Sequence, residues 1–122
     1  MNIANALEGA YGSMYYVRDM QKAVQYYKDM FDLKPISESP GWSEFDWNGH
    51  KVCLHLAEPS AEIDGKAIFI AKVKGLTGIV AELKKRGVEF SKDIHSVCEG
   101  GYAADFRDSS GNLLSLFEYT GE

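Results

Sequence analysis

The chain contains one pattern twice, and this internal repeat limits its fold more than any other feature. A strand pattern ending at Val17 leads into a helical pattern, and a strand pattern ending at Val73 leads into another at a constant offset. Each helical pattern is followed by a further strand and a hairpin. The order strand–helix–strand–strand–strand therefore occurs twice, and the sequence predicts an α+β fold built from two βαβββ modules.

Apolar residues at helical spacing define both helices. In the first helix they are Met20, Val24, Tyr27 and Phe31, and in the second they are Leu76, Ile79, Val80 and Leu83. The carboxylate of Asp19 is expected to cap the first helix, because it can accept hydrogen bonds from the amides of the first turn. Gly87 is expected to end the second helix.

Two hairpins complete the pattern. In the first, strands at Trp42–Trp47 and Lys51–Ala57 flank Asn48-Gly49, a strong signal for a two-residue turn. The second turns at residues 109–112, where Asp108 closes the turn and Gly111 supplies a positive φ. Between the second helix and this hairpin we expect a short strand at 88–94, followed by a loop that holds His95 and Cys98.

Composition restricts the class of protein. Hydrophobic residues make up 45% and charged residues 25%, as in ordinary globular domains, and the net charge is −5. This charge argues against nucleic acid or an anionic membrane as a partner, and no apolar run reaches the length of a membrane span. The N-terminus does not resemble a signal peptide. Two cysteines without Cys-x-x-Cys spacing favour free thiols in a reducing cytoplasm over a Cys53–Cys98 bridge.

The front segment YYVRDMQKAVQYYKDMFDLK and the back segment FRDSSGNLLSLFEY together carry a family resemblance. The chain resembles the vicinal oxygen chelate superfamily, which contains glyoxalase I, the bleomycin and fosfomycin resistance proteins and the extradiol dioxygenases. The resemblance runs from about Tyr11 to Tyr119, and Ser109 replaces the usual proline of the back motif. It implies one domain over 1–122, with modules at about 11–58 and 66–120, a half-barrel with a concave cavity, and a homodimer.

In metal-dependent members the ligands come from the first and last strands of each module. The resemblance places these four positions on Gly12, His55, a residue near Ile68, and Ser115. Of these side chains only His55 is a good ligand, and a catalytic site needs about three. A one-step shift in the first hairpin would put Cys53 in place of His55, which does not improve the site. We therefore expect no metal, although a makeshift divalent site of Glu44, His55 and a residue of a dimer partner stays open.

Strand alternation predicts which side chains line the cavity. Val52, Leu54 and Leu56 are expected to pack under the helices, so that Cys53 and His55 point to the opposite face. Tyr16, Trp42, Glu44 and Phe117 share this parity on their own strands, and Arg107 lies where it could reach the rim and bind an anion. Such a lining suits a planar or cationic organic molecule. The alternative is that these aromatic residues fill the core or a dimer interface, which is the expectation for Trp47.

Three functions remain open on the sequence. The first is a metal-independent member of the glyoxalase/bleomycin resistance/dioxygenase group that binds a small, partly aromatic molecule at His55, Glu44, Trp42, Tyr16, Phe117 and Arg107. The second is a lyase, isomerase or dioxygenase with a nonstandard metal site around His55. The third is a partner-binding module whose cavity is filled by its own side chains.

Overall fold

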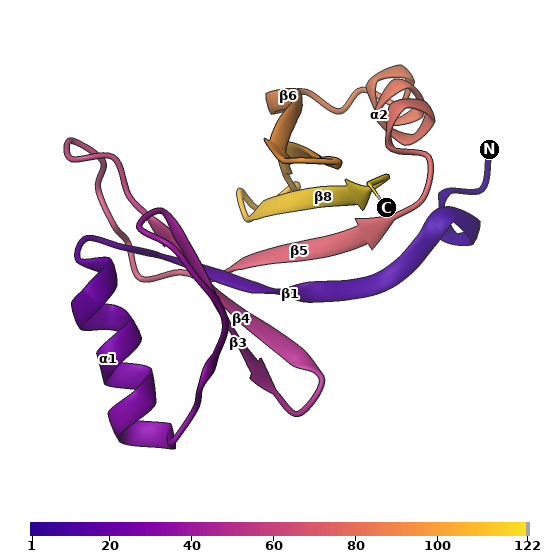
Figure 1. Cartoon of the computed structure of the whole chain (residues 1–122). Coiled ribbons are helices and arrows are strands. Elements are labelled where there is room, and N and C mark those ends of the chain that lie inside the picture. Colours follow the sequence, from indigo (N-terminus) through magenta and orange to yellow (C-terminus); the bar gives the residue numbers. More distant parts are fainter. Residues whose placement is uncertain (122) are drawn as a thin grey trace. The chain divides into compact units, whose positions relative to one another are not determined.

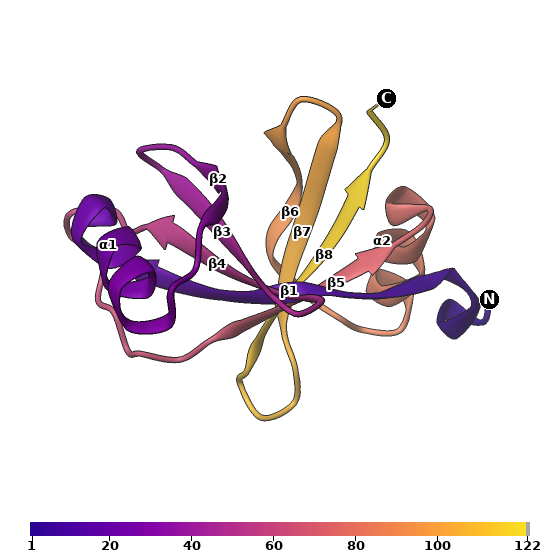
Figure 2. The same cartoon turned by 60° about the horizontal axis from the view of Figure 1, so that its bottom comes forward.

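The computed structural model describes residues 1–121 and contains the predicted element order (Figures 1 and 2). A short 3₁₀ turn, η1 (Ile3–Ala6), precedes the first module. That module consists of β1 (Leu7–Val17), α1 (Met20–Phe31), β2 (Pro35–Glu38), β3 (Trp42–Trp47) and β4 (His50–Leu56). The second consists of β5 (Ile68–Val73), α2 (Leu76–Lys85), β6 (Phe90–Cys98), β7 (Gly101–Arg107) and β8 (Leu113–Tyr119). The α+β class and the βαβββ repeat are confirmed.

The chain forms two compact units. The first unit is Gly12–Ala67, and the second unit combines Met1–Tyr11 with the chain from Ile68 onward, so that the division falls within β1. The strands of the first unit follow the order β2-β3-β4-β1, and the other strands of the second follow β6-β7-β8-β5. In each unit the last strand of the module pairs in parallel with its first strand, β4 with β1 and β8 with β5.

The core of the first unit lies between α1 and one face of its sheet. Met20 and Val24 of α1 pack against Phe45 and Leu54 of the sheet, and all four are almost fully buried. The side chain of Asp19 accepts a hydrogen bond from the amide of Lys22 at 3.1 Å, which confirms the predicted helix cap. Since Leu54 faces α1, alternation directs its neighbours Cys53 and His55 to the other face of the sheet.

The second unit repeats this packing with a different helix cap. Its buried core consists of Val73, Leu76, Ile79, Val80, Ala104 and Leu116. Gly75 precedes α2 and has no side chain to cap it, but both carboxylate oxygens of Glu118 accept hydrogen bonds there. The amide of Gly75 lies 2.7 Å from Oε2, and the amide of Leu76 lies 3.0 Å from Oε1. Glu118 of β8 therefore caps the start of α2 and has a structural role.

The turns follow the sequence expectations closely. Asn48 and Gly49 both have positive φ, at 53° and 105°, as the two-residue hairpin turn requires. In the second hairpin the carboxylate of Asp108 accepts from the amides of Ser110 and Asn112, both at 2.9 Å. These contacts fix the turn, and the hydrogen bonds from Asn112 hold the pKa of Asp108 below its usual value.

The sequence expectations are wrong for two parts of the chain. The strand predicted over 88–94 extends to Cys98, so His95 and Cys98 belong to β6 instead of a loop. The backbone of this segment pairs with β7 even though its side chains are mostly polar and exposed. Trp47 was expected in the core but is 40% exposed, because it lies at the end of β3. Its ring meets that of Phe31 at the end of α1, at 4.9 Å between ring centroids.

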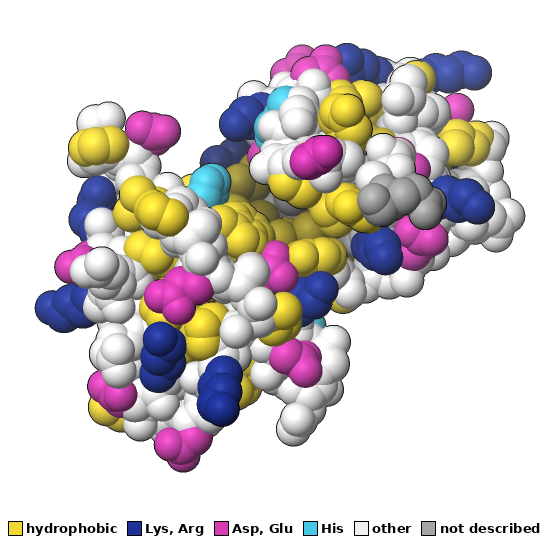
Figure 3. Space-filling view, in the orientation of Figure 1, with side chains coloured by type: hydrophobic (Ala, Val, Ile, Leu, Met, Phe, Trp, Pro, Cys, Tyr) yellow, Lys and Arg dark blue, Asp and Glu magenta, His cyan; other side chains and the backbone are white. Residues whose placement is uncertain are grey.

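Two further features bear on function. Cys53 and Cys98 are both free, the first buried and the second exposed, which agrees with the expectation of free thiols. Neither helix of the described chain is long and apolar enough to cross a membrane. On the face visible in Figure 3, acidic and basic side chains are interspersed with apolar ones.

Candidate functional site

The face of the first unit turned away from α1 brings together four of the six predicted site residues. The strand registers arrange its side chains in rows across β3, β4 and β1. Trp42 lies opposite His55, and His55 lies opposite Tyr16. In the next row Glu44 lies opposite Cys53, and Cys53 lies opposite Met14. Shared strand parity, read from the sequence, correctly placed Tyr16, Trp42, Glu44 and His55 on one surface.

The first row consists of three rings. The imidazole of His55 lies 5.0 Å from the ring of Tyr16 and 5.5 Å from that of Trp42, measured between centroids, with interplanar angles of 30° and 60°. Tyr16 is 38% exposed, and Trp42 and His55 are half-buried. This row therefore offers partly exposed aromatic surface at Tyr16, Trp42 and His55, which is suitable for contact with a planar molecule, while Nδ1 of His55 is itself buried.

The second row contains a buried carboxylate. Glu44 is only 8% exposed, and its Oε2 accepts a hydrogen bond from Nε1 of Trp42 at 2.7 Å. A short bond of this kind between an indole N–H and a carboxylate is charge-assisted, so it fixes both side chains relative to each other. The sequence placed both residues on one face but did not show this bond, although an i, i+2 pair on a strand is the spacing that permits it.

The thiol of Cys53 lies beside this carboxylate and is chemically quiet. Burial and, as a smaller effect, the negative charge of Glu44 together raise its pKa to about 12, although Lys51 opposes both. The side chain is fully buried. Because a thiol with such a pKa stays protonated at neutral pH, Cys53 is neither a nucleophile nor a ready thiolate ligand.

Phe117 and Arg107 belong to the second unit. Phe117 lies opposite Lys72 and Ala103 in the strand registers, and its ring meets that of Tyr11 edge-on at 5.1 Å. Arg107 donates from a terminal nitrogen to the carbonyl of Gly111 at 2.9 Å, so it braces the turn of its own hairpin.

The residues at the expected metal positions do not fit a metal ion. A Cβ atom built on Gly12 would lie 2.3 Å from the carbonyl oxygen of Lys51, so β4 leaves no room for a ligand side chain on β1 at this point. Ile68 is buried hydrocarbon. Ser115 lies opposite Ile70 where β8 pairs with β5. Cys53 lies opposite Met14 where β4 pairs with β1 in the same way. The counterpart of Ser115 in the repeat is therefore Cys53 and not His55.

Within residues 1–121 no three His, Cys, Asp or Glu side chains are grouped so that they could hold a metal ion. The expected metal positions offer few groups that could bind an ion. Gly12 has no side chain, Cys53 is a protonated thiol and Ile68 is hydrocarbon. Ser115 offers a hydroxyl, and the imidazole of His55 lies on the strand face that Cys53 shares. Zinc, iron and manganese sites use several thiolate, imidazole or carboxylate ligands together, which these residues do not supply. We derive no chemical step through a metal at this site.

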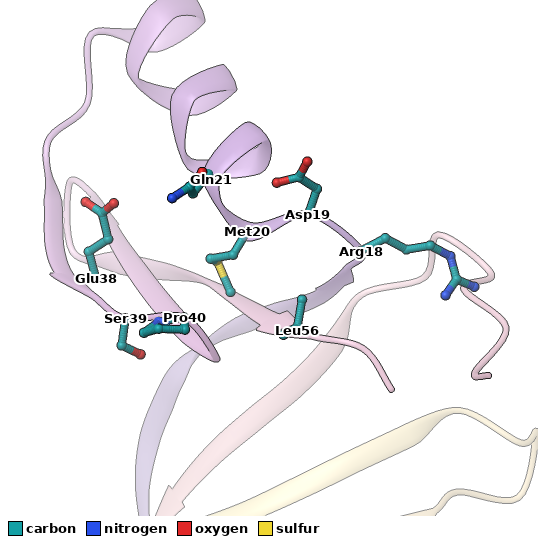
Figure 4. A pocket seen from close by; sticks show the side chains of 8 residues that line it. All are labelled: Arg18, Asp19, Met20, Gln21, Glu38, Ser39, Pro40 and Leu56. Carbon is teal, nitrogen blue, oxygen red and sulfur yellow. The ribbon is translucent and has the colours of Figure 1, made fainter. Parts of the chain in front are cut away.

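A surface hollow of about 670 Å³ lies elsewhere, on the helix side of the first unit (Figure 4). Met20, Pro40 and Leu56 supply its apolar lining, and none of the four residues of the candidate site takes part. Its charged side chains are already engaged: Asp19 caps α1, Glu38 pairs with Lys28 at 3.6 Å, and Arg18 donates to the carbonyl of Ala61. Its polar groups thus maintain the local fold, and we base the site on the ring row instead.

Comparison with known proteins agrees with this fold. The chain belongs to the Glyoxalase/Bleomycin resistance protein/Dioxygenase superfamily, whose sequence model matches residues 11–116. This confirms the resemblance seen in the sequence. Among curated proteins it is similar to the uncharacterized protein YetH of Bacillus subtilis (strain 168), with 30% identity over 112 residues, 84% of this chain and 92% of that protein.

Solved structures show the same architecture. Methylmalonyl-CoA epimerase from Mycobacterium tuberculosis superimposes with a TM-score of 0.75 at 16% identity, covering 95% of this chain and 91% of the epimerase. The Mn(II)-bound glyoxalase from Novosphingobium aromaticivorans gives a TM-score of 0.64 at 18% identity, covering 95% of this chain and 40% of the glyoxalase. At these identities the likeness establishes the fold and leaves the chemistry to the site.

Proposed function

We propose that this member of the superfamily binds a small, partly aromatic organic molecule on the face formed by Tyr16, Trp42, His55 and Glu44, and that it does so without a metal ion. The observation that supports the proposal is the ring row of Tyr16, His55 and Trp42, with the carboxylate of Glu44 held against Trp42 at 2.7 Å. Partly exposed aromatic rings beside one oriented polar group are typical of small-molecule sites.

Each side chain has a definite part in this binding. Tyr16 and Trp42 offer stacking surface, which is worth about 0.5–1.5 kcal/mol per aromatic pair beyond area burial. The imidazole of His55 can donate or accept a hydrogen bond at the centre of the row. Glu44 is fixed by Trp42, so it costs little further ordering when a ligand binds.

We also propose that the protein functions in a reducing compartment. Two free thiols, one of them exposed, fit a reducing compartment such as the cytoplasm. We also propose a homodimer, as expected from the resemblance to the superfamily. Neither point enters the argument for the ligand site.

A thermal-shift screen of small aromatic metabolites and aromatic antibiotics tests the site. Compounds that raise the melting temperature of the wild-type protein should lose most of this effect in Trp42→Ala and in His55→Ala. The matched controls are Trp47→Ala and His50→Ala, which change the same residue types at exposed positions on the same strands. Shifts that persist undiminished in both site variants would show that the molecule binds elsewhere.

A further inference from the structure

We infer that the molecule bound on this face carries a positive charge next to its aromatic ring, and that Glu44 is the counter-ion for this charge. The inference rests on the proposed function and narrows its ligand to aromatic ammonium compounds. It follows from three features of the site: the burial of the carboxylate, the charges around it, and the rings beside it.

The carboxylate of Glu44 is removed from water but remains next to the ring row. At 8% exposure it has lost most of its hydration, and the indole N–H of Trp42 donates a hydrogen bond to it at 2.7 Å. A carboxylate in such surroundings interacts with a cation more strongly than one in bulk solvent does, because the local dielectric constant is lower.

The charged side chain of the second row is Glu44, since its neighbours in that row are Cys53 and Met14. Lys51 lies one row away, opposite Asp46 on β3 and opposite Gly12 on β1. The thiol itself carries no charge at neutral pH. A cation that reaches this row therefore meets the carboxylate of Glu44 as its nearest charged group within the row, whereas an anion is repelled by that group.

The rings favour the same kind of ligand. Trp42 and Tyr16 flank the imidazole of His55, and Trp42 also contacts the carboxylate, so an ammonium group next to Glu44 lies close to an indole face. Cation–π attraction adds about 0.5–2 kcal/mol, with tryptophan the strongest partner. A neutral aromatic molecule gains the stacking but neither of the two electrostatic contributions.

Three probes that share one ring separate these contributions: 2-phenylethylammonium, 2-phenylethanol and 3-phenylpropanoate. Isothermal titration at pH 7 should show the ammonium compound binding about tenfold or more tightly than the alcohol, and the carboxylate most weakly. In Glu44→Gln the preference for ammonium over alcohol should disappear, while binding of the alcohol is retained. Asp46→Asn, which changes a carboxylate in the next row, is the matched control and should keep the preference.

Equal or tighter binding of the alcohol or the carboxylate by the wild-type protein overturns the inference, as does an undiminished preference in Glu44→Gln. If Glu44→Gln does not fold, the affinities of the wild-type protein and of Asp46→Asn for the three probes still test the inference. If none of the three probes binds, the inference fails, whereas the proposed function is judged separately by the thermal-shift screen.

Discussion

At the scale of single residues, position decides the chemistry of identical side chains. Cys53 is fully buried beside a carboxylate, while Cys98 is exposed at the end of β6. The same contrast separates Trp42, which donates to Glu44, from Trp47, which lies at the exposed end of the same strand. Strand parity could predict the face on which Cys53 and Trp42 lie, and it permits the contact of Trp42 with Glu44 on the same strand. It could not predict how deeply each side chain is buried, because burial depends on residues from other elements.

The two thiols should therefore differ in reactivity. With the pKa of Cys53 raised to about 12, its thiolate fraction at pH 8 is roughly a thousandfold below that of a thiol with the ordinary pKa. In the native protein Ellman's reagent at pH 8 should release one equivalent quickly, from Cys98, and the second only after denaturation. Rapid release of two equivalents, or of one equivalent from Cys98→Ser, would contradict the assigned environment of Cys53.

The same shift predicts a loss of stability in alkaline solution. The pKa is higher in the folded than in the unfolded chain, so the folded state holds its proton while the unfolded thiol ionises. The contribution of Cys53 is complete below about pH 8.5, the ordinary thiol value, and is lost as the pH rises toward about 12. Urea unfolding at pH 7 and pH 10 should show a smaller decline for Cys53→Ala than for the wild-type protein.

The bond between Trp42 and Glu44 should contribute measurably to stability. Trp42→Phe keeps a ring but removes the N–H donor of a buried carboxylate, and we expect it to lower the free energy of unfolding by about 2 kcal/mol. Trp47→Phe, at an exposed position on the same strand, should cost less than about 1 kcal/mol. Similar costs for the two changes in urea unfolding would argue against a special role for the indole N–H.

At the scale of elements, the two helices show which contacts a sequence can and cannot reveal. The cap of α1 is local, from Asp19 to Lys22, and was predicted. The cap of α2 comes from Glu118 on β8, far along the chain, and was missed. The signal for it was indirect: Gly75 has no side chain that could cap a helix, so the cap had to come from another element.

Removal of this distant cap should weaken the start of α2. We expect Glu118→Ala to lower the free energy of unfolding by about 1–2 kcal/mol, because two helix amides lose their acceptor. Hydrogen exchange at Gly75 and Leu76 should become faster in the variant. Glu99→Ala, at an exposed glutamate of the second unit, serves as the control and should leave both quantities nearly unchanged.

The close packing of β1 against β4 at Gly12 should be disrupted by the addition of a side chain. A methyl group at this position would lie 2.3 Å from the carbonyl of Lys51, so Gly12→Ala must displace one of the strands. We expect a loss of about 1–3 kcal/mol in urea unfolding. By contrast Gly78→Ala, in open space on α2, should gain up to about 1 kcal/mol. If Gly12→Ala is as stable as the wild-type protein, the strands are farther apart than described.

The limits of two strands were the least predictable part of the fold. β1 begins at Leu7, well before the segment with clear alternation, and Gly9 within it has a positive φ of 119°. β6 continues to Cys98 through a mostly exposed stretch. Both segments are strands because a neighbouring strand pairs with their backbone, and a hydrophobic pattern records only side chains that are buried.

At the scale of the whole molecule, the repeat made the architecture predictable. Val17 and Val73 end the first strands of the two modules, and α1 and α2 begin three residues later in each. Neither module has enough residues to bury a large core, so two similar modules had to be part of one chain. Function was less accessible, because the same architecture occurs in an epimerase and in a Mn(II)-bound glyoxalase.

We propose that the first unit uses its aromatic rings and the carboxylate of Glu44 to recognise an organic molecule, and that the residues at the expected metal positions do not hold an ion. Isothermal titration of Mn²⁺ into chelator-treated protein tests it most directly, with His55→Ala in parallel. The account predicts no saturable binding in either protein up to about 1 mM, since a lone imidazole is a weak site. One Mn²⁺ bound per chain by the wild-type protein, and lost in His55→Ala, would contradict it.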